Sequence, residues 1–207
     1  MPKGSPELTY ARKEEIICAC KTLYKDMSFK DITILKIAQY TTFSRASIYN
    51  YFETKEEIFL SILKNEYELW VDELENITDS NERMTKDEIA KALAASLERR
   101  ELLLKLMSMN HYDMEENSRE EQLCEFKVSY GKSLKAVEKL LEKFCTDMDE
   151  KARQDFLYAF FPFIYGIYPY TVVTEKQKNA IKKAGVAFSY HSIYDIAYTC
   201  LKKLLEG

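Results

Sequence analysis

Glycine and proline are scarce in this chain, whose 207 residues include five glycines and four prolines. Average use is about 7% glycine and 5% proline. A β-rich fold of this length needs many tight turns, and tight turns rely on these two residues. Hydrophobic residues still make up 46% of the chain, which is enough to bury a sizeable core. The composition therefore argues against a β-rich protein and predicts an all-α fold.

Residues that bind metals or form disulfides are also few. The chain has two histidines, far apart, and five scattered cysteines without a CxxC pair. This pattern predicts reduced core thiols in a cytoplasmic protein and offers no metal-ligand spacing. The carboxylate pairs at 115–116 and 120–121 fit solvated charges better than acid–base catalysis, which needs a cleft and a partner. We therefore expect no enzyme activity, no metal and no cofactor. The cysteines are Cys18, Cys20, Cys124, Cys145 and Cys200.

Long uncharged runs are rare, and the longest candidate extends for 19 residues from Phe156 to Thr174. That length approaches the roughly 20 residues that span a bilayer. The run contains Pro162 and Pro169 and lacks basic flanks, and a helix that is apolar all round can equally be buried in a large protein or in an interface. The first 20 residues carry several charges, which argues against a signal peptide. We expect a buried helix here and no membrane segment.

Charge is distributed unevenly along the chain. Residues 1–55 hold nine Lys or Arg and six Asp or Glu, a net charge of +3. Residues 56–207 hold 21 and 28, a net charge of −7. A basic segment on an acidic remainder is the asymmetry expected of a DNA-binding module attached to a body that DNA repels.

Apolar spacing and capping residues predict a series of helices. The first is expected at 12–25, and two short ones follow at 34–40 and 45–52, with Thr33 and Ser44 as their N-caps. A capping box at Thr54 opens a long helix to about residue 76, before a polar loop at 78–83. Further helices are expected after capping residues 85, 118 and 174, at 102–112, from 156 onward and at 190–204.

Two short helices joined by a turn and packed on a longer one describe a helix-turn-helix, here at about 33–52. We therefore predict a three-helix DNA-binding domain at 1–56 and a larger helical domain at 57–207. A recognition helix needs small or polar side chains at its N-terminal end, with donors for phosphates beside them. Helix N-termini also attract phosphates. The residues predicted to contact double-stranded DNA are Thr33, Thr42, Ser44, Arg45, Ala46, Ser47, Tyr49, Asn50, Tyr51 and Lys55.

The runs 29–38 and 43–58 resemble the DNA-binding domain of the tetracycline-repressor (TetR) family over about residues 10–65. That family usually has glycine where this chain has Thr42, so the resemblance implies a turn conformation that favours glycine. It also often has glycine at the position of Ala46 and histidine at that of Tyr51. The matching positions are Thr33, Ile37, Ala38, Ser44, Tyr49, Phe52, Lys55 and Glu56.

The resemblance implies a homodimer that forms through the last two long helices and binds a small molecule inside the C-terminal body. The uncharged run from Phe156 is rich in aromatic residues, which suit flat or apolar ligands. A helix here would be apolar around its whole circumference, which also favours burial against a partner subunit. The predicted ligand-binding residues are Met107, His111, Phe126, Tyr130, Phe160, Ile164 and Tyr168. The predicted dimer-interface residues are Phe161, Tyr165, Ile193, Ile196 and Cys200.

We expect a sequence-specific transcriptional regulator, a repressor that a small apolar or aromatic effector releases from a palindromic operator. One alternative is a DNA-bound structural or cell-organising protein of the same fold that has no effector. Another is a helical enzyme, for which the sequence offers no nucleophile–base or metal motif.

Overall fold

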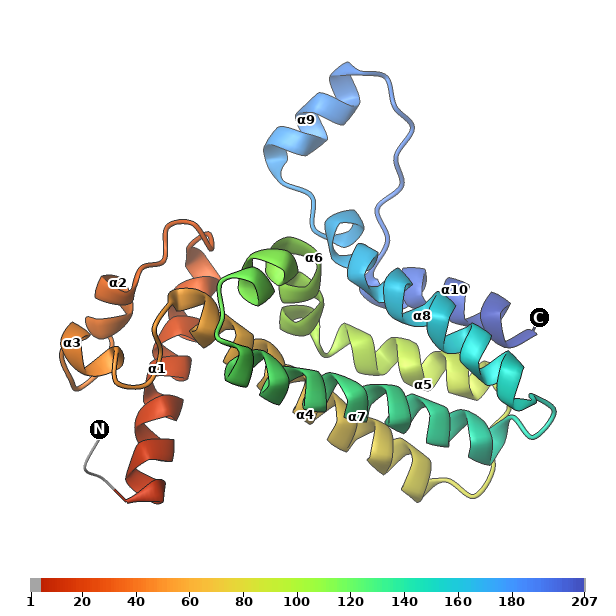
Figure 1. Ribbon diagram of the computed structural model, residues 1–207. Helices are drawn as coiled ribbons and strands as arrows, with labels where there is room; N and C mark the ends of the chain where they lie inside the picture. The colour runs from red at the N-terminus through yellow and green to blue at the C-terminus, as the bar shows by residue number, and fades with distance from the viewer. Residues whose placement is uncertain (1–4, 207) are drawn as a thin grey trace. The chain divides into compact units, whose positions relative to one another are not determined.

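The computed structural model of the protein describes residues 5–206, and every regular element in that range is a helix, as the composition predicts. Residues 1–4 and 207, which belong to the two predicted domains, lie outside the described range. Figure 1 labels the helices along the chain. They are α1 (Pro6–Asp26), α2 (Ile34–Ala38), α3 (Arg45–Ile48), α4 (Lys55–Ser80), α5 (Lys86–Glu98), α6 (Glu101–Glu116), α7 (Glu120–Phe144), α8 (Glu150–Thr171), α9 (Glu175–Lys183) and α10 (Ile193–Glu206).

The chain forms two compact units. Unit 1 comprises residues 1–65 and 110–129, and unit 2 comprises residues 66–109 and 130–207. Unit 1 therefore holds α1, α2 and α3 together with parts of α4, α6 and α7, and the remaining helices belong to unit 2. The predicted domain division between residues 56 and 57 stays a prediction.

Helix α1 supports the rest of unit 1. It begins six residues before the predicted start, because the Ser5 side chain accepts from the backbone N–H of Leu8 and Pro6 follows as the first helical residue. Its predicted apolar face is confirmed as buried. The buried residues on that face are Ile16, Ile17, Cys20, Leu23 and Tyr24.

The two short helices begin where predicted and end early. The side chains of Thr33 and Ser44 cap α2 and α3 by accepting from the backbone N–H three residues on. Each helix then tightens into turns, since Tyr40 donates to the Ile37 carbonyl and Tyr51 to the Ile48 carbonyl. The predicted ends at 40 and 52 were therefore too late. Helix α2 packs against both α1 and α3.

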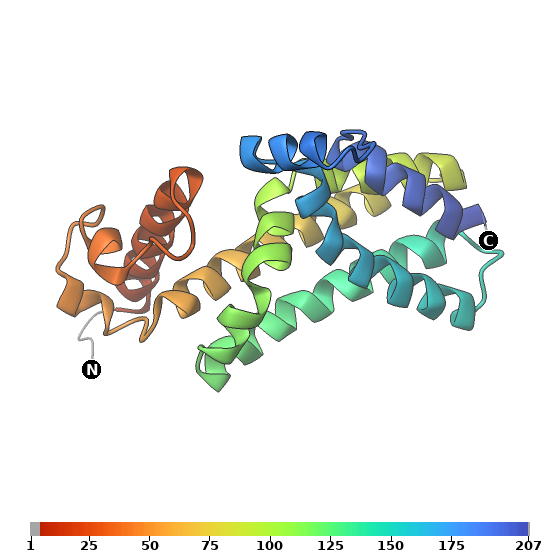
Figure 2. The same ribbon diagram turned by 90° about the horizontal axis from the view of Figure 1, so that it is seen from above.

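Unit 2 is built around aromatic side chains. Trp70 of α4 is fully buried and donates from Nε1 to the Ser96 hydroxyl at 3.0 Å. The rings of Phe160 and Phe161 of α8 lie 6.4 and 6.0 Å from Trp70. The ring of Tyr130 lies 5.8 Å from Phe161, edge to face. Helix α10 completes this core by packing against α5 and α8 (Figure 2).

Helix α8 continues through Pro162 and Pro169, although each proline lacks the N–H that would bond to the carbonyl four residues earlier. One of these carbonyls accepts a hydrogen bond from a side chain, and the other lies at an exposed position. Pro169 has no N–H for the carbonyl of Tyr165, and the Ser108 hydroxyl donates to that carbonyl at 2.6 Å instead. Pro162 leaves the carbonyl of Tyr158 at an exposed position of the helix. Within residues 5–206 no single helix is long and apolar enough to cross a membrane, although α8 and α9 together, bent by 84°, meet that test by length and composition.

Two expected features of the chain connections are wrong. Helix α4 continues to Ser80 because Thr78 is buried and donates to the Leu74 carbonyl, so the loop predicted at 78–83 is shorter. Ser118 does not open α7, which begins at Glu120; its hydroxyl donates to the carbonyl of Met114 in α6. The capping boxes at Thr85 and Thr174 are confirmed.

The prediction that all five cysteines are core thiols is also wrong. All five are free thiols, but Cys18 and Cys124 are exposed. Both lie on helix faces that the apolar periodicity leaves outside the core. Cys20 is buried, and burial raises the pKa of its thiol to about 12.

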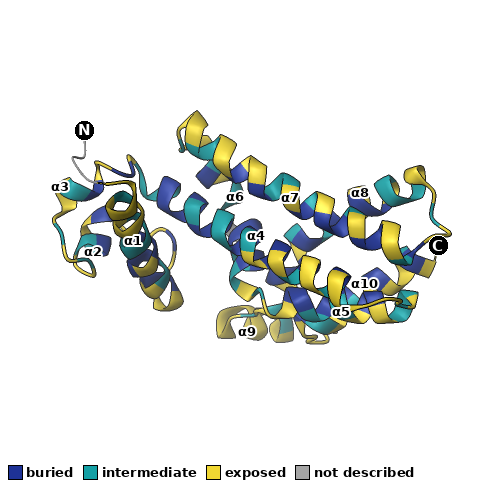
Figure 3. Cartoon of the chain, turned by 90° about the horizontal axis from the view of Figure 1, so that it is seen from below, coloured by how far each residue is buried: buried dark blue, intermediate teal, exposed yellow. Residues whose placement is uncertain are grey.

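Helix α9 differs from every other long helix of unit 2, because none of its residues is buried. Figure 3 shows it as exposed along its length, and Figure 1 shows it held on two extended connections. Its ends are nevertheless well formed. Gly185 adopts φ +66°, which lets Val186 donate to the Ile181 carbonyl and close the helix.

Candidate nucleic-acid interface

The turn before α3 is held by α1. The backbone N–H of Thr42 donates to Glu15 Oε1, and the Thr42 hydroxyl donates to Glu15 Oε2 at 3.1 Å. No described residue other than Gly185 has a positive φ. The expectation that Thr42 must adopt a conformation that favours glycine is therefore wrong, since the carboxylate of Glu15 fixes a turn that a β-branched residue adopts without strain.

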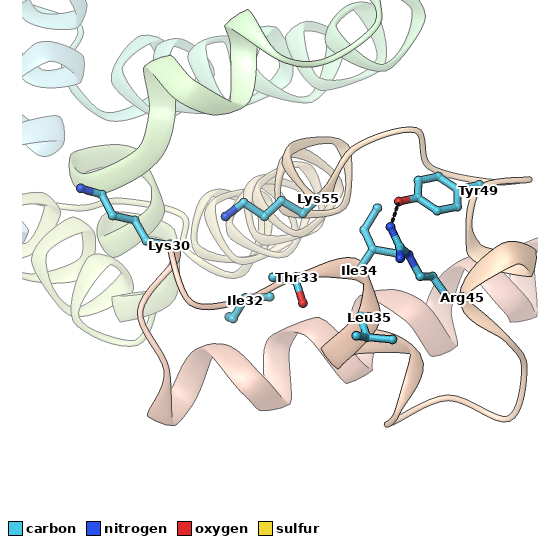
Figure 4. Close-up of a pocket in the computed structure, with 8 residues that line it drawn as sticks. All are labelled: Lys30, Ile32, Thr33, Ile34, Leu35, Arg45, Tyr49 and Lys55. Atoms are coloured by element: carbon cyan, nitrogen blue, oxygen red, sulfur yellow. Dashed lines mark hydrogen bonds between the residues drawn. The ribbon is translucent and has the colours of Figure 1, made fainter.

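Arg45 and Tyr49 form a pair on the outward side of α3. The Arg45 guanidinium donates from Nη2 to the Tyr49 hydroxyl at 3.1 Å and lies 5.6 Å from the centre of the ring. Both residues are exposed, as are Ala46 and Asn50. Figure 4 shows the two side chains meeting at the hydrogen bond. Tyr49 therefore limits the orientations of the Arg45 side chain.

A hollow of about 460 Å³ adjoins this pair (Figure 4). Its lining includes two exposed residues that are absent from the predicted contacts, Lys30 and Leu35. Leu35 is 54% exposed because α2 buries its neighbours Ile34 and Ile37. The sequence could have indicated this exposure, because Leu35 is apolar but does not share the helical register of Ile34 and Ile37. The lining residues are Lys30, Ile32, Thr33, Ile34, Leu35, Arg45, Tyr49 and Lys55.

Lys55 lies at the edge of the hollow and is partly engaged within the chain. Its ammonium donates to the Phe29 carbonyl at 2.8 Å and lies 4.4 Å from the centre of the Phe29 ring. Lys55 lines the same hollow as the N-cap residue Thr33, which is exposed. This is a suitable position for a phosphate, although a phosphate would compete with the carbonyl.

Tyr51 has a different position from the one predicted. It is 5% exposed, and its hydroxyl accepts from Arg12 Nη1 of α1 at 3.1 Å. The ring lies 6.5 Å from that of Phe43. Because the short α3 turns its next residues back toward α1, Tyr51 serves packing, and we remove it from the predicted contacts. Thr42, Ser44 and the half-buried Ser47 remain at the surface around α3.

The seven predicted ligand-binding residues are divided between the two units. His111 and Phe126 belong to unit 1, where the two rings lie 6.1 Å apart. His111 Nε2 lies 3.1 Å from the Glu115 carboxylate, but burial lowers the pKa of His111 against the opposing effect of Glu115. The other five belong to unit 2, where all but the half-buried Tyr130 are buried. These five are Met107, Tyr130, Phe160, Ile164 and Tyr168.

Two of the five predicted dimer-interface residues point into their own subunit. Phe161 is 3% exposed within the aromatic core, and Ile193 is 7% exposed at the start of α10. Their assignment to the surface of an interface is wrong. Phe161 belongs to the residues that α8 buries, at 156, 157, 160, 161, 164, 167 and 168, and Ile193 belongs to those that α10 buries, at 193, 197, 201 and 205. Tyr165, Ile196 and Cys200 are half-buried and keep surface for a partner.

The fold and the site together define a helix-turn-helix protein with a larger helical body. Residues 16–62 match the family described as bacterial regulatory proteins, tetR family. Residues 64–192 match the C-terminal domain described as tetracyclin repressor-like. The chain belongs to the tetR family of bacterial regulatory proteins.

Individual relatives are distant. The HTH-type transcriptional regulator HbdR of Aromatoleum sp. (strain CIB) is 32% identical over 83 residues, which span 38% of this chain and 36% of that relative. The fatty acid degradation regulator FadR from Bacillus halodurans is 17% identical with a TM-score of 0.59, over 99% of this chain and 97% of its own. FadR from Thermus thermophilus, solved in complex with lauroyl-CoA, is 16% identical with a TM-score of 0.57, over 94% of each chain. These two structures share the fold.

Proposed function

We propose that this protein is a sequence-specific DNA-binding transcriptional regulator in which residues 1–56 bind DNA and residues 57–207 carry effector binding and dimerisation. The observation that carries the proposal is the exposure of Arg45 and Ala46 in the first turn of the capped helix α3, together with that of Asn50 in the turn that follows it. Small and polar residues there would allow the backbone to approach base edges, and the exposed guanidinium of Arg45 supports a contact with one of them. Membership of a family of regulatory proteins supports the same function.

Selection from a pool of randomised DNA duplexes tests this proposal. The intact protein should enrich a twofold-symmetric sequence whose half-sites lie about 34–36 Å apart, because two recognition helices of a dimer enter successive major grooves. Affinity for that sequence should fall steeply with salt, since each phosphate contact contributes a slope of about −0.9 in log affinity against log salt concentration. A pool that stays unenriched would contradict the proposal.

We propose further that the protein is a repressor and that a small, largely apolar or aromatic effector releases it from DNA. The aromatic side chains Trp70, Tyr130, Phe160 and Phe161 supply the apolar surroundings that such a ligand requires. The lauroyl-CoA complex of a structural neighbour supports an acyl chain as a first probe. An effector weakens DNA binding only by its differential affinity for the two states of the protein.

Lauroyl-CoA is tested against a preformed protein–DNA complex, with coenzyme A as the matched control that lacks the chain. Release by lauroyl-CoA but not by coenzyme A would support an acyl effector. Release by neither, together with release by a panel of aromatic acids, would assign the aromatic alternative. A complex that resists every compound would favour the DNA-bound structural protein without an effector.

We propose that dimerisation uses the surface of α8 and α10. A groove of about 560 Å³ lies between them, lined by Phe163, His191, Asp195, Ile196, Thr199, Cys200 and Lys203. A permanent dimer of this kind should bury roughly 2,000 Å² or more. Sedimentation at low micromolar concentration should give a dimer that Ile196→Asp dissociates. Val128→Asp, which places the same charge at an exposed position of unit 1, should leave the dimer intact.

A further inference from the structure

Glu57 is a buried carboxylate in the first turn of α4. Its side chain is 0% exposed, and its oxygens accept four hydrogen bonds. The backbone N–H of Glu53 donates to Oε2 at 2.7 Å, and the backbone N–H of Arg119 donates to Oε1 at 3.2 Å. The Arg119 side chain supplies the other two, from Nε to Oε1 at 2.6 Å and from Nη2 to Oε2 at 2.9 Å.

Arg119 reaches Glu57 from the connection between α6 and α7, which is more than 60 residues further along the chain. The same guanidinium also contacts the segment that follows α3, because Nη1 lies 3.3 Å from the Glu53 carboxylate and Nη2 donates to the Tyr51 carbonyl at 3.4 Å. Thr54 adds a parallel link by donating from its hydroxyl to the Asn117 carbonyl at 3.0 Å. All these residues belong to unit 1.

The charge state of the pair follows from these contacts. Burial alone would raise the pKa of Glu57, but the hydrogen bonds from Arg119 and the two backbone N–H groups outweigh it and lower the pKa below its ordinary value. The hydrogen bond to Glu57 likewise raises the pKa of Arg119. Both groups are therefore charged at neutral pH, and a buried charge of this kind is stable only while its partner is present.

Helix α3 needs such support because it has four residues, too few to be stable by themselves. Its entry is fixed by the Ser44 cap and by the bond between Thr42 and Glu15. Its exit is fixed by the burial of Phe52 and by the contacts of Arg119 with Tyr51 and Glu53. The planar guanidinium of Arg119 presents its donors as a fork with fixed directions, toward the carboxylates and the carbonyl at once, and the compact ammonium of a lysine lacks this fixed geometry.

We propose that Arg119 is a positioning residue for the DNA interface: it fixes the exit of α3 through Glu57, Glu53 and Tyr51 without contacting DNA itself. This inference rests on the proposed DNA-binding function. It assigns a role in DNA affinity to a residue more than 60 positions away from the helix-turn-helix.

Arg119→Met tests the role, with Arg99→Met as the matched control. Arg99 forms a comparable ion pair with Glu73, but on the surface of unit 2. Affinity for a duplex selected by the wild-type protein should fall on the order of 10-fold in Arg119→Met and stay unchanged in Arg99→Met. Arg119→Lys, which keeps the charge and loses the fork, should be intermediate.

Two readouts separate positioning from the alternatives. If Arg119 contacted a phosphate directly, its loss in Arg119→Met would reduce the slope of log affinity against log salt concentration by about 1. If Arg119 is a positioning residue, the slope of the variant equals that of the wild type. The double variant Glu57→Gln with Arg119→Met removes the uncompensated charge, so its melting temperature should recover relative to Arg119→Met while its DNA affinity stays low. Recovery of both together would show that Arg119 acts only on stability.

The pH dependence of stability gives a further check. Glu57 faces Arg119 and Glu53, and Glu121 acts on Arg119 in turn. In the wild type the pKa of Glu57 is lower in the folded protein than in the unfolded chain, so its ionisation contributes stability at pH values above the unfolded-state pKa. This stability is lost as pH falls through the folded-state pKa. In Arg119→Met burial should raise that pKa instead, so stability should be lost as pH rises toward neutral.

The outcomes distinguish this inference from the function on which it rests. If wild-type protein enriches no duplex, the DNA-binding proposal fails and no variant needs to be compared. If the wild type binds its duplex and Arg119→Met binds equally well, the positioning role alone is wrong. A lower salt slope in Arg119→Met would also overturn it, since Arg119 would then contact phosphates directly.

Discussion

The two units of this protein are both helical, but each is stabilised internally by contacts of a different kind. Unit 2 relies on aromatic packing around Trp70, whose indole is fully buried and whose one polar atom is paired with Ser96. Unit 1 contains α2 and α3, of five and four residues, and depends on capping side chains and on the buried Glu57 carboxylate. Long helices can be fixed by one apolar stripe, whereas short ones need polar contacts at both ends.

Trp70→Ala should give the largest effect on stability. Removing a fully buried indole leaves a cavity and the Ser96 hydroxyl without its donor, so the free energy of unfolding should fall by about 3–5 kcal/mol. Urea unfolding followed by circular dichroism measures it. The neighbouring Leu69→Ala, at a side chain that is 43% exposed, should cost far less. Equal losses in the two variants would contradict the claim that the stability of unit 2 relies on aromatic packing around Trp70.

Arg45→Ala should act on DNA binding and leave stability almost unchanged, because the side chain is exposed. We expect a loss of about 1–3 kcal/mol on the selected duplex, with relaxed preference at one base pair of each half-site. Fluorescence anisotropy with selected and scrambled duplexes measures it, and the exposed Arg83→Ala in unit 2 is the control. An equal loss on both duplexes would make Arg45 a phosphate contact instead.

Ser44→Ala tests the dependence of unit 1 on its caps. The Ser44 side chain accepts from the backbone N–H of Ser47, and losing that bond should lower the free energy of unfolding by about 1 kcal/mol. Ser44→Gly should lower it by only a few tenths, since glycine is a tolerated cap. Chemical denaturation of the three proteins side by side is sufficient. Identical midpoints for all three would show that α3 does not depend on its cap.

Tyr51→Phe should have a similarly small effect on stability and none on the electrostatics of DNA binding. The change removes the hydroxyl that accepts from Arg12 and keeps the buried ring, so we expect a loss of about 0.5–1.5 kcal/mol of stability. The salt slope of DNA binding should not change, because the structure places this hydroxyl in an internal contact. A slope lower by about 1 would return Tyr51 to the phosphate contacts.

Local features of the sequence predicted most of the fold. Thr33, Ser44 and Thr85 were identified as N-caps from their side chains and the apolar positions that follow, and all three cap helices as expected. The register of buried residues in α1 was also predictable, since it depends only on the helical period.

Contacts between distant segments could not be predicted. Nothing local to Glu57 indicates that its partner is Arg119, and an acidic residue in a first helical turn is ordinarily explained by the helix dipole. The outward Leu35 and the inward Tyr51 depend on where α2 and α3 end, which the tight turns decide. The burial of Phe161 depends on which side of α8 packs against Trp70. Because the sequence of this helix is apolar around its whole circumference, it does not specify that side.

The central claim is that the outward side of α3 binds a specific DNA sequence. Its most direct test is the affinity of the intact protein for the selected duplex and for a scrambled duplex of the same composition, measured at one salt concentration. We predict that the selected duplex binds at least about 10³-fold more tightly. Equal affinities for the two duplexes, or binding to neither, would contradict the claim.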